Sequence, residues 1–593
     1  MSEKFRREVI YALVGRVSAE RGKSQILNRS RLADQVYVSG LAARETVARL
    51  AGAISRPART TRSLFGRAPP RLLIAPSDIR TADPTLADDI YAGYFAFAGK
   101  VVNAHGSVVF DAPAPSRAWA AALAGFGWLR HLRASGTPLA RANARALVGD
   151  WIAARRRGGV DWEPGVVARR LVSWLSQSPL LLEDVDIADY RRFMKALGRH
   201  AAFLRDALAG ELKGADRLVA LVGLVEFALC AEGQAKQLRR ATRDLSAELG
   251  RQILADGGHI GRDPQTALDL LLDFLPLRQA YVSRGQAAPP QLLNAIDRML
   301  PLLRLFRLGD GSLALFNGMG ATQPHQLAAV LAHDEARAAA MLDAPYSGYQ
   351  RLEAGESCLV MDAGRPPPPA YSAQAHAGCL SFEFASEGCR LVVNCGSPPE
   401  AFADLRDAAR SSAAHSTLVV DDTSSCRLAP LTARTKAVAG WIVAGPRRVS
   451  TTRSWDADHE GLWASHDGYA REFGLVHDRN LSLSRDGGLL RGEDRLSPAD
   501  GRAMPSVPFA IRFHMHPTVG LESGANGAIH LVARNGARWL FRSSAPASIE
   551  ESIYFAMVDR PRGCEQIVVA ANSGEAPAVA WTFERVAEPS AEA

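Results

Sequence analysis

Residues 373–396 read AQAHAGCLSFEFASEGCRLVVNCG, and residues 410–422 read RSSAAHSTLVVDD. In the first stretch Leu380, Phe382 and Phe384 alternate with polar residues, which is the period-two pattern of a half-buried strand. The tripeptide SEG forms a compact turn, and CRLVV follows as a second apolar run. The pattern therefore predicts a β-hairpin, and the second stretch predicts a third strand.

Polar side chains flank these predicted strands. His376 precedes the first strand, Asn394 ends the second, and His415 opens the third, which we expect over 415–420. Because a sheet brings the ends of neighbouring strands together, we expect these three side chains to converge. Their chemistry is suited to an anion or a metal, and histidine can also carry a proton.

The two stretches resemble the C-terminal signature of the heparinase II/III-type polysaccharide lyases, roughly H-A-D-x-L-S-F-E-L, then G, then R, then A-H-N-T-x-x-x-D. The segment ASHDGY at 464–469 is also similar to that domain. The resemblance implies an incomplete (α/α) toroid followed by a large antiparallel β-sandwich. It also implies a lyase that cleaves an acidic, uronic acid-containing polysaccharide, such as a glycosaminoglycan, by β-elimination.

Composition is that of an ordinary globular protein of two or three domains. The chain has 593 residues, of which 47% are hydrophobic and 22% charged. No run approaches the ~18 apolar residues that a membrane-spanning helix needs. The N-terminus lacks an apolar core followed by a small-residue cleavage site, so no secretory signal is expected. The resemblance implies the cell envelope or periplasm, and the cytoplasm is the alternative.

Net charge favours an acidic partner. Lys and Arg number 70 against 62 Asp and Glu, which gives a net charge of +8, although a coding bias toward Arg explains this charge equally well. We find no zinc-finger spacing, RNP-like strand or helix-turn-helix, so we expect an acidic polysaccharide and no nucleic acid. The 7 cysteines form no CxxC pair and predict no disulfide framework. Oligomeric state is not indicated.

Hydrophobic periodicity divides the chain into three parts. Residues 1–85 form a basic helical arm, with helical pieces at 3–18 and 30–54 and an exposed basic linker at 56–71. Residues 86–310 show helical periodicity with Pro or Ser at helix starts and form the toroid domain. Expected helices are 116–129, 137–158, 164–176, 187–209, 215–230, 235–255, 264–282 and 290–307.

Residues 311–593 change to period two and form the sandwich domain. A helical piece is expected at 325–341, and Asn535-Gly536 predicts a tight hairpin turn. Expected strands include SLALF, SCLVMD, LSFEF, RLVVN, STLVVDD, KAVAGWIVAG, RRVSTTRSW, HLVAR, ARWLF, CEQIVVAAN and AVAWTFERV.

β-Elimination requires that the uronate carboxylate is neutralised, its C5 proton removed and the leaving O4 protonated. By resemblance, His376, Asn394 and His415 match positions that hold a metal in some family members. Because Asn394 replaces the usual Asp, we expect a weak structural Zn²⁺ site or none, and no required cofactor. The catalytic candidates are His415, Tyr469, His376 and His466. The substrate-binding candidates are Arg410, Asn394, Gln374, Asp216, Arg217, His259 and Arg262.

Several positions depart from the family pattern. Gln374 stands where a catalytic His is common, and Thr266 stands where a catalytic Tyr is common; neither is a good proton carrier. Gly378 replaces the usual Asp of the motif, and residues 214–217 replace an Asn-His pair. A non-catalytic glycan-binding protein of the same fold is therefore the alternative. A glycoside hydrolase that uses two of Asp216, Asp263 and Asp269 is a third hypothesis.

Overall fold

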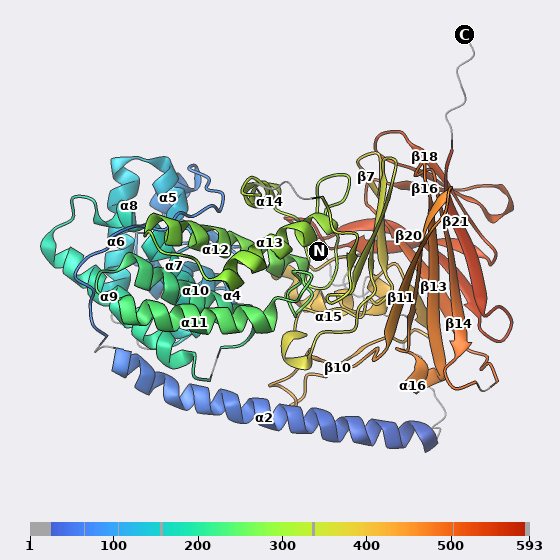
Figure 1. Cartoon of the computed structure of the whole chain (residues 1–593), viewed down its shortest axis with the longest axis horizontal. Helices are drawn as coiled ribbons and strands as arrows, with labels where there is room; N and C mark the ends of the chain where they lie inside the picture. The colour runs from blue at the N-terminus through green and yellow to red at the C-terminus, as the bar shows by residue number, and fades with distance from the viewer. Residues whose placement is uncertain are drawn as a thin grey trace, which may run out of the picture.

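The computed structural model describes residues 25–63, 66–104, 106–154, 158–210, 212–334, 339–501 and 503–586. The helix predicted over 3–18 lies outside these residues. A helical half and a β half lie side by side, and the long helix α2 runs along one edge of both (Figure 1). In the described part of the chain, no helix is both long and apolar enough to cross a membrane.

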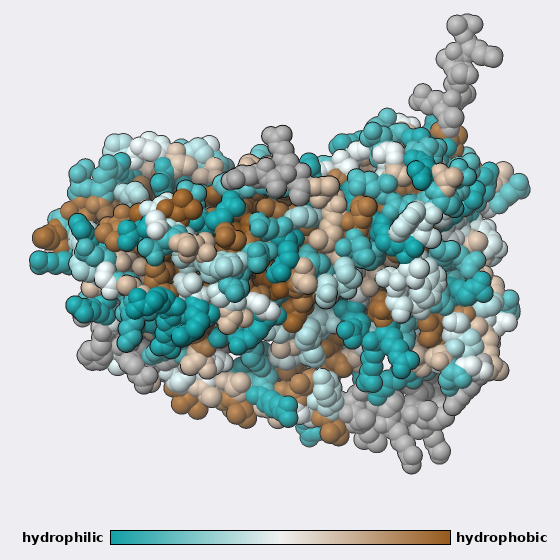
Figure 2. Space-filling view, viewed as in Figure 1, coloured by the Kyte–Doolittle hydropathy of each residue, from teal (hydrophilic) through white to brown (hydrophobic). Residues whose placement is uncertain are grey.

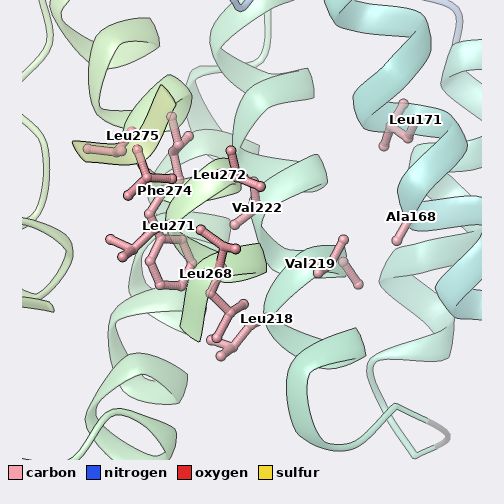
Figure 3. Close-up of a cluster of buried hydrophobic side chains, with 14 of the residues drawn as sticks. Ala168, Leu171, Leu218, Val219, Val222, Leu268, Leu271, Leu272, Phe274 and Leu275 are labelled. Carbon is pink, nitrogen blue, oxygen red and sulfur yellow. The ribbon is translucent and has the colours of Figure 1, made fainter. Parts of the chain in front are cut away.

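The helical half is built around α10 (Gly214–Cys230), which is buried continuously from Leu218 onward. A helix that is apolar on all sides belongs in the middle of a domain. Figure 3 shows its Leu218, Val219 and Val222 beside side chains of α7 and α12. The other helices of this half among the described residues are α2 (Gln25–Ser63), α3 (Leu86–Tyr91), α4 (Arg117–Gly125), α5 (Leu129–Ser135), α6 (Pro138–Ala153), α7 (Pro164–Ser176), α8 (Ser178–Leu182), α9 (Ile187–Ala207), α11 (Ala235–Gln252), α12 (Pro264–Ser283), α13 (Pro290–Leu305) and α14 (Pro324–Leu331). Two short helices, α15 (Arg406–Ala409) and α16 (Ala470–Phe473), lie between strands of the β half.

The β half consists of two antiparallel sheets. In the nine-stranded sheet the order is β19-β20-β15-β7-β6-β5-β4-β3, with β8 also paired to β15. Its strands are β3 (Asp343–Ala344), β4 (Tyr349–Ala354), β5 (Ser357–Asp362), β6 (Phe382–Ser386), β7 (Cys389–Val393), β8 (Leu418–Val420), β15 (Pro508–Met515), β19 (Ala547–Tyr554) and β20 (Arg562–Asn572).

The eight-stranded sheet has the order β11-β12-β13-β14-β21-β18-β17-β16. Its strands are β11 (Val449–Trp455), β12 (His459–His466), β13 (Leu475–Ser484), β14 (Leu489–Pro498), β16 (Gly520–Ser523), β17 (Ile529–Val532), β18 (Arg538–Ser543) and β21 (Ala578–Val586). Two small hairpins lie outside the sheets, β1 (Tyr94–Phe97) with β2 (Lys100–Asn103), and β9 (Arg427–Leu428) with β10 (Ile442–Ala444).

The β6–β7 hairpin lies at the centre of the molecule. Phe382 and Phe384 point into the core between the two sheets, where Phe382 stacks on Trp581 with ring centroids 5.7 Å apart. On the opposite face, Val360 of β5 and Ala385 of β6 join the core of the helical half. The strand was expected to be half-buried, but it is buried on both faces because the toroid covers the second one.

Several boundaries differ from the sequence expectation. The first part of the predicted linker at 56–71 is helical, because α2 extends to Ser63. Of the helix expected over 325–341, the structure shows α14, which ends at Leu331. Residues 312–316 (SLALF) do not form a strand. Within them, Leu313 makes an isolated β-bridge with Arg307. The β1–β2 hairpin inside the helical half and the long strands β13 and β14 were not predicted. The Asn535-Gly536 hairpin is confirmed between β17 and β18.

Candidate functional site

Two histidines come together at the end of the central hairpin. His376 Nδ1 lies 3.1 Å from His415 Nε2, and both side chains are buried. His415 was expected to open a strand, but it follows a short 3-10 turn, and two residues separate it from β8. The structure therefore brings the two rings together through loops at the edge of the sheet.

Hydrogen bonds fix the protons of this pair. His415 Nδ1 lies 2.6 Å from the Ser411 carbonyl oxygen, so it carries a proton and donates it. His415 Nε2 is then the acceptor, and His376 Nδ1 donates to it. His376 Nε2 faces the Ser397 hydroxyl at 3.3 Å. Both rings are neutral, and each proton on the pair has a partner.

Burial makes both rings poor bases. It lowers the pKa of His415 to about 4, although the bond to Ser411 opposes the shift. Burial, His415 and Arg410 together lower the pKa of His376 well below its ordinary value. A general base works best when its pKa is near the working pH. Neither histidine meets this condition at neutral pH.

Asn394, the third residue of the predicted metal site, does not offer a ligand atom to a metal between the two histidines. Asn394 Oδ1 accepts a hydrogen bond of 3.0 Å from the Ser416 backbone N–H. Its buried Nδ2 has no hydrogen-bond partner among the described residues, and an amide NH₂ is no metal ligand. Within the described ranges, no group of three or more His, Cys, Asp and Glu side chains is placed to hold a metal ion. These residues do not fit a zinc ion.

The toroid meets the histidine pair through one loop. Asn317 Oδ1 accepts a hydrogen bond from the His376 backbone N–H, and Asn317 Nδ2 donates to the Arg262 carbonyl oxygen. The next residue, Gly318, lies between Asp263 and Gln374; a Cβ there would be 2.8 Å from Asp263 Oδ2. The first turn of α12 therefore adjoins the loop that carries His376.

Gln374 and Thr266, which stand at this junction where the resemblance implies a catalytic His and Tyr, are not proton carriers. Gln374 is exposed, and Thr266 is tied to Asp263 by a 2.9 Å hydrogen bond. Asp263 caps α12 by accepting the Gln265 N–H. Burial raises the pKa of Asp263 to about 6, with the Thr266 bond opposing the shift. Gln374 and Thr266, which depart from the family pattern, therefore lie where the first turn of α12 meets the loop that carries His376.

Tyr469 does not occupy a position from which it could move a substrate proton. It is 1% exposed, belongs to the core between the two sheets, and donates its hydroxyl proton to the Leu418 carbonyl oxygen at 2.9 Å. Burial raises the pKa of its hydroxyl. The predicted role of this phenol therefore does not fit its surroundings.

His466, the predicted neighbour of Tyr469, belongs to a buried network. Its Nδ1 accepts the Gly468 N–H, and its Nε2 donates to His477 Nδ1 at 3.3 Å. His477 Nε2 donates to Asp494, which also receives a 2.7 Å bond from Arg479 Nε. This chain of bonds holds β12, β13 and β14 together, so the surroundings of His466 indicate a structural role.

Arg410 lines a pocket of about 540 Å³ next to the histidine pair. The guanidinium is 2% exposed and donates to the carbonyl oxygens of Ala375 and Ser372, while Asp407 lies 3.9 Å away. Burial lowers the pKa of Arg410 to about 10, with Asp407 opposing the shift. The polar lining of this pocket comprises Arg410, Arg427, Asp404, Asp407, Glu472, Ser411, Thr423 and Ser424.

Three of the four predicted substrate-binding residues of the toroid are engaged in hydrogen bonds or ion pairs within the protein. Arg217 donates to Glu248 at 3.0 Å and to the Leu208 carbonyl oxygen. Arg262 is buried and pairs with Asp362, so it joins the toroid to β5. His259 donates from Nε2 to Gln252 at 2.9 Å, and burial lowers its pKa to about 4. Asp216 is exposed at the start of α10.

Sequence reasoning did not name three residues of this junction as site residues. Asn317 and Ser397 contact His376 directly, and half-buried Tyr371 lies near His259, with ring centroids 6.5 Å apart. Asn317 adopts a positive φ of 52° in a Gly-rich turn, and an Asn-Gly pair is the sequence signal for such a turn. Nothing in the sequence around Ser397 or Tyr371 indicates the contact.

The fold is that of a polysaccharide lyase. A family model, Heparinase II/III-like, C-terminal, matches residues 336–582. The chain is 34% identical over 520 residues to FtsZ-localized protein C of Caulobacter vibrioides, covering 83% of this chain and 88% of that protein. The chain therefore belongs to the heparinase II/III-like family.

Solved structures show the same architecture. A crystal structure of heparinase III aligns with a TM-score of 0.69 and 13% identity, covering 93% of this chain and 92% of that one. Heparan sulfate lyase HepC from Pedobacter heparinus aligns with a TM-score of 0.58 and 16% identity over 93% and 91% of the two chains. At these identities the likeness establishes the α/α toroid plus β-sandwich fold, which confirms the predicted fold class.

Proposed function

We propose that this chain is a non-catalytic glycan-binding protein that keeps the lyase fold. The observation that carries the proposal is the closed histidine pair, in which His376 and His415 bond to each other and have lowered pKa values. Gln374, Thr266 and buried Tyr469 supply no replacement for the missing proton carrier. A sugar polymer that bound here would find neither histidine nor Tyr469 available as a base, and the Asp263 carboxyl already accepts hydrogen bonds from Thr266 and the Gln265 N–H.

The pocket beside the pair supports binding of a sugar. Its volume of about 540 Å³ is within the range of small-ligand sites. Arg and carboxylate side chains are both present in its lining, together with three hydroxyls, so it offers hydrogen-bond donors and acceptors without a strong excess of one charge. This mixture favours a weakly charged glycan over the strongly acidic polysaccharide that the sequence predicted.

A glycan panel tests the proposal. Wild-type protein is titrated with heparan sulfate, chondroitin sulfate and neutral or amino-sugar oligosaccharides, while absorbance is followed near the unsaturated uronate band. We expect binding of at least one weakly charged glycan without a rise in absorbance. A rise would establish a lyase, new reducing ends without a rise would establish a hydrolase, and no binding would refute glycan recognition.

A pocket-filling variant locates the site. Thr423 is half-buried in the pocket lining, and its hydroxyl donates within its own turn to the Asp421 carbonyl oxygen. Thr423→Trp should block the pocket and weaken glycan binding by tenfold or more. Thr452→Trp, on the exposed edge strand β11, is the matched control and should bind as the wild type does. Equal affinities would place the glycan elsewhere.

The name of the Caulobacter relative supports a proposal on location. That protein is described as FtsZ-localized, and its identity of 34% extends over 83% of this chain. We extend the localisation to this chain as part of the proposal. A fluorescent fusion expressed with labelled FtsZ should give coincident signals, and a distribution independent of FtsZ would refute it.

A further inference from the structure

Helix α2 is held to the rest of the molecule by one face. Val38 is 7% exposed and Ala42 is 1% exposed, and both pack in a small core with Ala429 and Val438 from the loops around β9 and β10. On the toroid side, α2 packs beside α9, and Glu45 pairs with Lys213 at 2.6 Å. The helix therefore lies across both halves of the protein and leaves its other face outward.

The outward face carries a regular row of apolar residues. Val36, Val47, Leu50 and Ile54 are 73%, 66%, 56% and 76% exposed. Exposed Gly40 and Ala43 fill the intermediate positions. At 3.6 residues per turn this row lies on the side of the helix opposite the anchoring residues. Figure 2 shows hydrophobic residues along the edge of the molecule where α2 runs.

The spacing of this row is that of a coiled-coil seam. The six positions are separated by four, three, four, three and four residues, which is the alternation of a and d positions in a heptad repeat. Val47 and Ile54 fall at a, and Leu50 falls at d, a combination that favours two strands. The row from 36 to 54 is roughly 28 Å long at 1.5 Å per residue. A single additional helix would cover it.

Charge decides which helix can pair with it. Residues 25–63 contain seven Arg and two acidic residues. One of the two, Glu45, is already paired with Lys213 and Arg49, and Arg44 is exposed next to the seam. A second copy would bring two positively charged helices together, which is unfavourable. An acidic partner complements the seam.

We propose that the outward face of α2, the row from Val36 to Ile54, binds an acidic amphipathic helix of a partner protein by two-stranded coiled-coil pairing. Apolar residues of the partner at a and d would cover the row, and its flanking Glu or Asp residues would face the arginines. This interaction is separate from glycan recognition in the pocket beside the histidine pair.

A synthetic peptide tests the proposal on the full-length protein. The probe is a labelled three-heptad peptide with Ile at a, Leu at d and Glu at both e and g, which prevents the peptide from pairing with itself. Fluorescence anisotropy should show saturable binding that weakens as salt rises. Leu50→Glu should weaken binding tenfold or more. Ala48→Glu adds the same charge off the row and should change affinity less than threefold.

Four results would overturn the proposal. The peptide could fail to bind the wild type, or Leu50→Glu and Ala48→Glu could weaken binding equally. Sedimentation could show a dimer that Leu50→Glu dissociates, which would make a second copy the occupant. Finally, Leu50 could be needed for binding to vesicles with anionic lipid and not to the peptide. Because Leu50 is more than half exposed, its substitution leaves the fold intact, which thermal unfolding checks.

Discussion

His376 Nδ1 donates to His415 Nε2 across 3.1 Å, and this contact occupies one nitrogen of each ring. The remaining nitrogens are directed at Ser411 and Ser397. The pair therefore joins two loops of the sandwich to the Asn317 loop of the toroid junction. Its geometry explains how a lyase fold can retain motif histidines while they serve as structural hydrogen-bonding groups.

Stability should depend on pH through this pair. In the folded protein the pKa of His415 is about 4, against 6.5 for the free side chain, so the unfolded chain binds more protons between these values. Stability is therefore complete above about pH 6.5 and is lost as pH falls toward 4. His415 alone should account for about 2 kcal/mol lost between pH 7.5 and pH 5.

Urea titrations at the two pH values check this expectation. His415→Asn should reduce the difference between pH 7.5 and pH 5, whatever its effect on stability at either pH. His333→Asn, at an exposed position after α14, should leave the difference unchanged. If the wild type and His415→Asn lose equal stability on acidification, His415 does not titrate as described.

Zinc should not stabilise the protein. Asn394 supplies its oxygen to Ser416, and the two histidines bond to each other, so a zinc ion would have to break both hydrogen bonds to gain two nitrogen ligands and one oxygen ligand. Thermal unfolding with equimolar Zn²⁺ and with a chelator should give the same Tm. A rise with zinc that His415→Asn abolishes would contradict this prediction.

Many helices and strands of the fold could be predicted from the sequence, and the elements that were not predicted have physical causes. Asp263 before Pro264 marks the start of α12, and apolar periodicity follows it. Strand β13 was not predicted because its inward positions include His477 and Arg479, which are fully buried and pair with Asp494. A buried ionic network removes the apolar alternation by which a strand is found, and its partners come from distant segments.

The candidate site was predictable in part. The placement of His376 and His415 at strand ends indicated that they would meet, and the structure brings them into contact. Their protonation depends on the Ser411 carbonyl oxygen and on burial under the toroid, which no local pattern encodes. Tyr469 matched a motif, yet its hydroxyl faces the Leu418 carbonyl oxygen inside the sandwich.

Removing Phe382 should test the central hairpin. The side chain is fully buried and stacks on Trp581, so Phe382→Ala should destabilise the protein by about 3–5 kcal/mol. Thr452→Ala on the exposed edge strand should cost less than about 1 kcal/mol. Denaturant titration measures both losses in the free energy of unfolding. A loss for Phe382→Ala as small as that for Thr452→Ala would show that the Phe382 face of β6 does not lie in the core.

Arg479 should be essential to the sandwich. It bonds to Asp494 and to the carbonyl oxygens of Leu380 and Ser416, all within the core. Arg479→Met leaves a buried carboxylate without its main partner and should cost about 3–5 kcal/mol. Arg479→Met/Asp494→Asn should recover part of that loss, because the unpaired charge is gone. Equal stabilities for the single and double variants would show that the charge is not the cause.

The attachment of α2 can be tested at two adjacent residues that lie on different faces of the helix. Ala42 is 1% exposed against the core with Val438, whereas Ala43 is exposed on the outward row. Ala42→Asp buries a charge and should release α2, whereas Ala43→Asp places the same charge in water and should leave α2 attached.

Limited proteolysis followed by mass spectrometry should find cleavage within 35–55 at least tenfold faster in Ala42→Asp than in Ala43→Asp. Because the toroid and sandwich cores are formed without α2, their thermal unfolding should stay close to that of the wild type in both variants. Equal cleavage rates in the two variants would mean that α2 is not held through the face that contains Ala42.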